Sequence, residues 1–114
     1  MPFSQTESWT PIGRATFSDL SSAITLGTST PTAGTIYTSL VDGFGNKAIP
    51  NHAIVSVETQ PVRITEQGTT PTSTVGRKVV AGSAYTITGS PDVIRTTKMI
   101  ETTASAAVTV DYYI

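Results

Sequence analysis

In two stretches of the chain, apolar side chains occupy every second position. The two recurring apolar sets are Ala53, Val55 and Val57, and Val108, Val110 and Tyr112. Because successive side chains of a β-strand point to opposite faces, each stretch is predicted to be a strand with one buried face. We expect these strands to cover residues 53–59 and 106–114.

Shorter alternating segments, separated by turn residues, make up most of the remaining chain. The other expected strands cover residues 12–20, 35–41, 62–65, 77–81, 84–88 and 93–97. Glycine, proline and asparagine between them supply the backbone angles that turns need. The only helix candidate, residues 17–24, is short and rich in serine. Strands spaced about 8 to 12 residues apart predict an all-β fold, a single-domain β-sandwich of jelly-roll-like type over residues 12–114.

The first eleven residues follow neither the helical nor the strand period. Pro2 and Pro11 bracket a polar stretch that carries Phe3 and Trp9. We expect residues 1–11 to form an extended N-terminal arm. Such an arm has too few contacts of its own to bury two aromatic side chains, so we predict that they bind a partner surface. The alternative is that Trp9 folds back and caps the sandwich of its own subunit.

Composition agrees with a β-rich fold and excludes several classes of function. The chain has 114 residues and is rich in β-branched Thr, Val and Ile, which pack well on a pleated sheet. Seven Lys and Arg balance eight Asp and Glu, so we expect no nucleic-acid partner. The absence of cysteine excludes disulfides and zinc–thiolate sites and suits assembly in a reducing cytoplasm. We expect neither a secretory signal nor a membrane-spanning segment.

Catalytic chemistry has few candidates in this sequence. His52 is the only histidine, and no cysteine or second histidine is present to complete a catalytic triad or a zinc site. The carboxylates are scattered singly, although Glu58 and Glu66 are a pair that folding could bring together across a cleft. We interpret His52 as a strand-entry residue and the carboxylates as solvated strand-face residues. The sequence therefore predicts a protein that is not an enzyme.

Two further clusters are candidates for binding ions. The loop from Asp42 to Asn46 carries oxygen ligands, but it lacks the additional carboxylates of a calcium loop, so we predict a hairpin turn. The basic residues of the second half are Arg63, Arg77, Lys78, Arg95 and Lys98. We interpret them as solvated strand-face residues that pair with nearby acidic residues, rather than as an anion site. No cofactor or metal is expected.

The C-terminal strand predicts a second contact surface. Tyr112 and Tyr113 point to opposite faces, so both cannot enter one core, and at least one should face solvent or a partner. With the arm, this gives the expected partner interface, which consists of Phe3, Trp9, Pro11, Tyr113 and Ile114.

The second half of the chain also resembles small bacteriophage virion proteins. The pattern is a strand carrying an arginine, a Gly-Thr-x-Pro-Thr turn, a glycine, an apolar strand and a closing Ala-Gly. The matching pieces are residues 53–58, Val62-Arg63, Gly68-Thr69-Thr70-Pro71-Thr72, Gly76, Ala81-Gly82, residues 85–89, Val93-Ile94-Arg95 and residues 108–113. In those proteins an aromatic residue often precedes the arginine, whereas this chain has Val62.

The resemblance implies a capsid decoration, or cement, protein. Such proteins are small β-rich domains that bind the outside of an icosahedral shell and bridge its subunits. The implied partner is the major capsid protein, the implied location is the capsid surface of the virion, and assembly would take place in the host cytoplasm. A domain this small at a symmetry axis of the shell would be a homo-oligomer, either a dimer or a trimer. The alternatives are a receptor- or glycan-binding virion module, whose aromatic residues would stack on sugars, and a small hydrolase.

Overall fold

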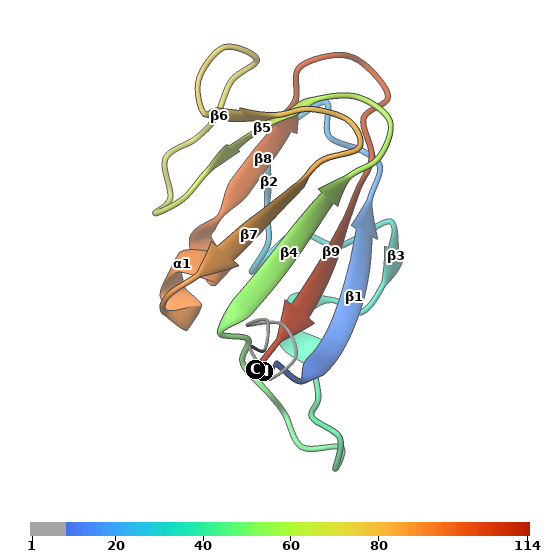
Figure 1. Cartoon of the computed structure of the whole chain (residues 1–114), viewed down its shortest axis with the longest axis vertical. Helices are drawn as coiled ribbons and strands as arrows, with labels where there is room; N and C mark the ends of the chain where they lie inside the picture. Colours follow the sequence, from blue (N-terminus) through green and yellow to red (C-terminus); the bar gives the residue numbers. More distant parts are fainter. Residues whose placement is uncertain (1–8) are drawn as a thin grey trace, which may run out of the picture.

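Two antiparallel sheets form the protein, as a computed structural model that describes residues 9–114 shows (Figure 1). The strands are β1 (Pro11–Phe17), β2 (Ile24–Thr25), β3 (Ala33–Gly34), β4 (His52–Val57), β5 (Val62–Thr65), β6 (Arg77–Val79), β7 (Ala84–Thr88), β8 (Lys98–Glu101) and β9 (Val108–Tyr113). One sheet has the order β3-β1-β9-β4-β7, and the other has the order β2-β8-β5-β6. This architecture confirms the predicted all-β fold.

The five-stranded sheet is built around the two strands with the clearest alternation. β9 lies between β1 and β4, and Val55 of β4 is opposite Val110 of β9. The inward set of both strands is almost completely buried: Ala53, Val55, Val57, Val108, Val110 and Tyr112 are each at most 2% exposed. The predicted faces of these two strands are therefore confirmed.

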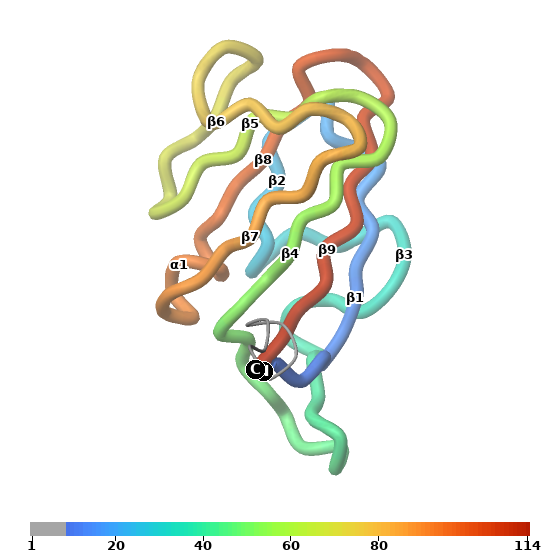
Figure 2. Tube along the Cα trace, viewed as in Figure 1, coloured from blue at the N-terminus to red at the C-terminus, as the bar shows by residue number. Residues whose placement is uncertain are grey.

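The second sheet and three loop leucines complete the core. Val62, Ile64 and Met99 are buried from the four-stranded sheet. Leu20, Leu26 and Leu40 lie outside the strands and are fully buried. The connections that carry Leu20 and Leu26 cross between the two sheets, whereas Leu40 lies in the connection from β3 to β4 of the same sheet (Figure 2). Apolar loop residues thus contribute to the core of the sandwich.

Two predicted strands were wrong, and the one helix candidate is not helical. Residues 35–41 contain the 3-10 helix η2 (Tyr37–Ser39) between extended residues, instead of a strand. Residues 93–97 belong largely to helix α1 (Pro91–Thr96), not to a strand. Residues 17–24 are not helical, because β1 ends at Phe17 and an irregular loop follows. Strands β2, β3 and β8 were not predicted.

Helix α1 forms because its sequence carries signals for the start of a helix, and these outweigh the short apolar alternation of residues 93–97. Proline is favoured in the first turn of a helix, because its fixed φ suits the helix and its missing N–H is not needed there. Pro91 takes this position, Asp92 lies in the first turn and Arg95 in the last, and both charges complement the helix dipole. Ile94 then turns into the core and is fully buried.

Candidate functional site

Four of the predicted interface residues meet at one end of the five-stranded sheet. Thr10 and Ile114 exchange two backbone hydrogen bonds, each with a nitrogen–oxygen distance of 2.9 Å. Pro11 lies opposite Tyr113 in the β1–β9 ladder. We expected Pro11 to be the last residue of the arm, but it is the first residue of β1. This pairing places Trp9, Pro11, Tyr113 and Ile114 beside one another. Phe3 lies outside the described residues.

Trp9 forms an aromatic cluster with residues of two strands. Its ring stacks on His52, with ring centroids 3.9 Å apart and an angle of 6° between the planes. The ring of Tyr113 is 5.8 Å away and tilted by 52°. His52 begins β4 and lies opposite Tyr113, so the ladder holds both partners of the tryptophan in place. Trp9 is thus half-buried against its own subunit, the arrangement that the sequence left as the alternative.

We expect replacement of His52 by alanine to change the fluorescence of this cluster. Trp9 is the only tryptophan, so its emission reports this site alone. Removal of the stacked imidazole exposes one face of the indole, and the emission maximum of the His52→Ala variant should shift to longer wavelength. The loss of one aromatic pair should cost about 0.5 to 1.5 kcal/mol of stability. An unchanged emission maximum would mean that Trp9 does not rest on His52 in solution.

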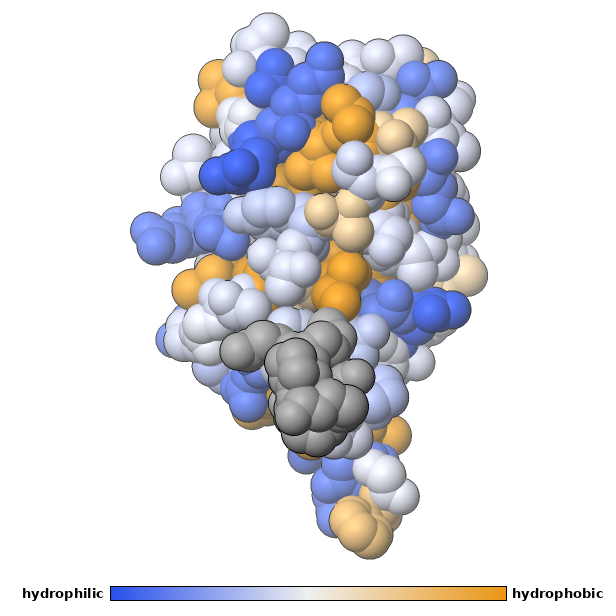
Figure 3. Space-filling model, viewed as in Figure 1, coloured by the Kyte–Doolittle hydropathy of each residue, from blue (hydrophilic) through white to orange (hydrophobic). Residues whose placement is uncertain are grey.

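The predicted hairpin turn is present and carries an exposed aromatic residue. Oδ1 of Asp42 accepts hydrogen bonds from the backbone N–H groups of Phe44 and Asn46, and Gly45 takes a positive φ of 81°. This segment projects beyond the sandwich at the end where the C-terminus lies (Figure 1), and its tip is apolar in the space-filling view (Figure 3). Phe44 is 91% exposed. The side chain of Asp42 thus stabilises the turn through these hydrogen bonds.

Sequence reasoning missed Phe44 as a candidate contact residue. The signal was present, because an aromatic side chain between two glycines at the tip of a turn has no strand face to pack on. Leaving a side chain of this size in water forfeits roughly 1.5 to 3 kcal/mol of burial free energy. Val41 and Ile49, which flank the turn, are also exposed.

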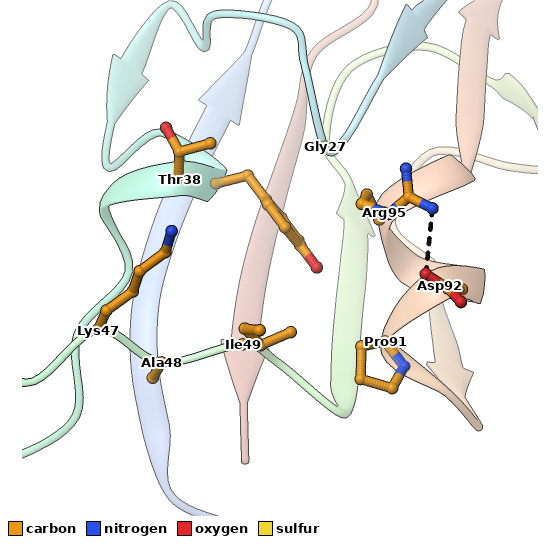
Figure 4. A pocket seen from close by; sticks show the side chains of 9 residues that line it. Gly27, Thr38, Lys47, Ala48, Ile49, Pro91, Asp92 and Arg95 are labelled. Carbon is orange, nitrogen blue, oxygen red and sulfur yellow. Dashed lines mark hydrogen bonds and ion pairs between the residues drawn. The ribbon is translucent and has the colours of Figure 1, made fainter.

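A pocket of about 300 Å³ opens between this projecting segment, η2 and α1. Its apolar lining includes Tyr37, Ala48, Ile49 and Pro91. Figure 4 shows Lys47 at one end of the opening and the ion pair of Asp92 and Arg95, 3.0 Å apart, at the other. The pocket can therefore accept a small apolar group with charges at its rim.

Two buried tyrosine hydroxyls lie near this pocket. Within residues 9–114, neither the hydroxyl of Tyr37 nor that of Tyr112 has a hydrogen-bond partner, and the two rings meet edge to face at 5.8 Å. Burial raises the pKa of both phenols, and Tyr37 raises the pKa of Tyr112 further. The folded protein thus keeps both tyrosines neutral.

The Tyr112→Phe substitution should reduce the loss of stability at alkaline pH. An unfolded tyrosine ionises near pH 10, whereas burial raises the pKa of Tyr112 in the folded protein, so the contribution of Tyr112 to the free energy of unfolding is constant below about pH 10 and falls above it. Without the hydroxyl, this fall should be smaller in denaturant titrations between about pH 8 and pH 11. At neutral pH the variant should lie within about 1 kcal/mol of the wild type, because no hydrogen bond is lost. A steeper alkaline fall in the variant would contradict this account.

The remaining candidate residues have structural partners. Glu58 accepts a hydrogen bond from Thr109 and Glu66 accepts one from Tyr85, so the two carboxylates serve different contacts. Arg63 donates to the backbone oxygens of Ser73 and Gly76 and thereby fastens the β5–β6 loop. In the described part of the chain, no group of three or more His, Asp and Glu side chains is placed to hold a metal ion.

Comparisons of this chain with protein-family models, curated proteins and solved structures find no match. Within residues 9–114, the structure has no helix of the length and hydrophobicity that a membrane span requires.

Proposed function

We propose that this protein is a phage capsid decoration protein that binds the outer surface of the head shell and stabilises it without turnover. The observation that carries the proposal is the gathering of aromatic and apolar side chains at one end of a rigid sandwich. Trp9, Tyr113 and Ile114 lie at this end, and the exposed Phe44 projects beyond it. The resemblance of the second half of the chain to virion proteins supplies the identity of the partner, the major capsid protein.

The chemistry of this end suits binding to a large surface. Aromatic residues are enriched in the centres of protein interfaces, where they combine large contact area with a polar edge. Phe44 is fixed by a turn whose backbone is held by Asp42, so little conformational entropy is lost when it docks. Residues 1–8 are attached to the sandwich at the same end, through Trp9. Arm and hairpin could therefore contact neighbouring subunits of a shell at once.

The alternative function is a glycan- or receptor-binding virion module. The aromatic cluster of Trp9, His52 and Tyr113 favours it, since flat rings at the end of a sheet can stack on sugar rings. On this alternative the protein is present in few copies per particle and binds isolated host cells or glycans.

Sedimentation of the purified protein with shells that lack it tests the proposal. A decoration protein should co-sediment, saturate at a copy number set by the symmetry of the shell, and raise the temperature at which the shells break open. Failure to bind shells, combined with binding to host cells or to an immobilised glycan panel, would establish the alternative instead.

A further inference from the structure

Strand β7 (Ala84–Thr88) is an open sheet edge whose own five residues carry no protection against pairing. Proteins usually protect such edges by keeping them very short or by placing charges, bulges or prolines on them. In the described sheets, the edge strands β2 and β3 have two residues each, and β6 carries Arg77 and Lys78. β7 has five residues, none of them charged and none of them glycine or proline. It is the exception among the four edges.

The hydrogen bonds at the start of β7 fix which backbone groups face outward. The N–H of Gly82 donates to the carbonyl of Val57, and the N–H of Val57 donates to the carbonyl of Ser83, with Gly82 at a φ of 84°. These are the bonds of a G1 bulge. Beyond it, bonded and non-bonded positions alternate along an antiparallel ladder, so Tyr85 and Ile87 bond to β4.

The intervening residues of β7 are left with free backbone groups. Ala84, Thr86 and Thr88 direct their N–H and carbonyl groups away from β4, and each residue is exposed. Within residues 9–114 none of these groups has another backbone partner. Helix α1 contacts β7 and β4 and buries Ile94 in the core; it lies beside the C-terminal end of β7 and does not run along the strand (Figure 1).

We propose that a second copy of this chain pairs with β7, antiparallel about a two-fold axis at Thr86, so that the two five-stranded sheets become continuous. In this register Thr86 meets Thr86 of the second copy, and Ala84 meets Thr88. Each such pair exchanges both of its backbone hydrogen bonds. A two-fold contact of this kind is self-complementary and closes with two copies.

The side chains of β7 also fit a second copy. On the outer face the pairing brings Thr86 of the two copies together, and on the inner face it places Tyr85 beside Ile87 of the partner strand. Thr–Thr pairs and pairs of an aromatic with a β-branched residue both stabilise antiparallel sheets. No like charges oppose one another within the strand. The nearest charges belong to Glu66, which accepts a hydrogen bond from the Tyr85 hydroxyl, and to Arg77, whose guanidinium lies over the Tyr85 ring. They are of opposite sign. The proposal concerns the isolated protein and does not rest on binding to a shell.

Sedimentation of the purified full chain from about 1 μM to about 1 mM tests the pairing. The wild type should pass from monomer to dimer as its concentration rises. Thr86→Pro removes an N–H that points only to the free edge, so it should leave the chain monomeric with unchanged circular dichroism. Thr86→Lys places two like charges at the axis and should weaken dimerisation at least tenfold, less at high salt. Ser56→Lys, on the same sheet face but in the interior strand β4, should dimerise as the wild type does.

Amide hydrogen exchange keeps the proposal testable if a variant folds poorly. In the wild type, exchange at Ala84, Thr86 and Thr88 should slow as the dimer forms, while exchange at Tyr85 and Ile87 should stay slow at all concentrations. A wild type that is monomeric at about 1 mM overturns the proposal. So does a dimer or trimer that is insensitive to both Thr86 substitutions, because its contact then lies on another surface.

Discussion

The Val110→Asp variant should not fold. Val110 is fully buried in the middle of β9, between Ala15 of β1 and Val55 of β4. A carboxylate at this position has no partner among its apolar neighbours, and its desolvation together with the lost valine contacts costs several kcal/mol. That is comparable with the whole stability of a small domain, roughly 5 to 15 kcal/mol. Circular dichroism should show no cooperative thermal transition.

The adjacent position supplies a matched control. Thr109 lies on the outer face of the same strand, and its hydroxyl bonds to the carboxylate of Glu58. Thr109→Asn keeps a polar group there without adding a like charge beside Glu58, and it should unfold cooperatively within about 1 kcal/mol of the wild type. Because Val110→Asn places the same side chain on the buried face of β9, the difference in stability between the two asparagine variants measures the effect of burial. Equal damage from the two asparagine substitutions would show that β9 is buried on both sides in solution.

Deletion of residues 1–8 should weaken binding to undecorated shells by a factor of roughly 10 to 150 while leaving the sandwich intact. The shortened chain retains Trp9 with its stacking partner His52, and it retains the Thr10–Ile114 hydrogen bonds. Its unfolding temperature should therefore be close to that of the full chain. The deletion removes Phe3, whose burial in a partner would contribute about 1.5 to 3 kcal/mol, a factor of roughly 10 to 150 in affinity. Co-sedimentation with shells and their resistance to heat measure the loss.

Two point variants separate the contributions to this binding. Phe3→Ala in the full chain should reproduce much of the loss if the arm binds through its aromatic residue. Phe44→Ser tests the projecting hairpin, and it should not reduce stability because Phe44 is already 91% exposed. If the shortened protein decorates shells as well as the full chain, the arm is not the anchor. The contact would then come from Phe44 or from the end formed by Tyr113 and Ile114.

The sequence determined the features that depend on a local period. Strict alternation in β4 and β9 identified both strands and their buried faces, because a one-residue shift of register would expose the whole apolar set. The turn at Asp42–Asn46 was predictable for the same local reason, since glycine, aspartate and asparagine supply its geometry directly. The bounds of β7 were predicted correctly as well.

Only the tertiary structure decided which of these pieces meet. Strand order depends on contacts between residues far apart in sequence, so no local pattern could show that Trp9 stacks on His52 or that Thr10 pairs with Ile114. The apolar residues at positions 36 and 40 are spaced as in a strand, but the chain there forms the 3-10 helix η2. Leu40, at the end of this helix, fills the core with its side chain, and tertiary packing thus overrides the local pattern. The open edge of β7 likewise follows from its place in the sheet, since a strand of the same sequence between two neighbours would have no free backbone groups.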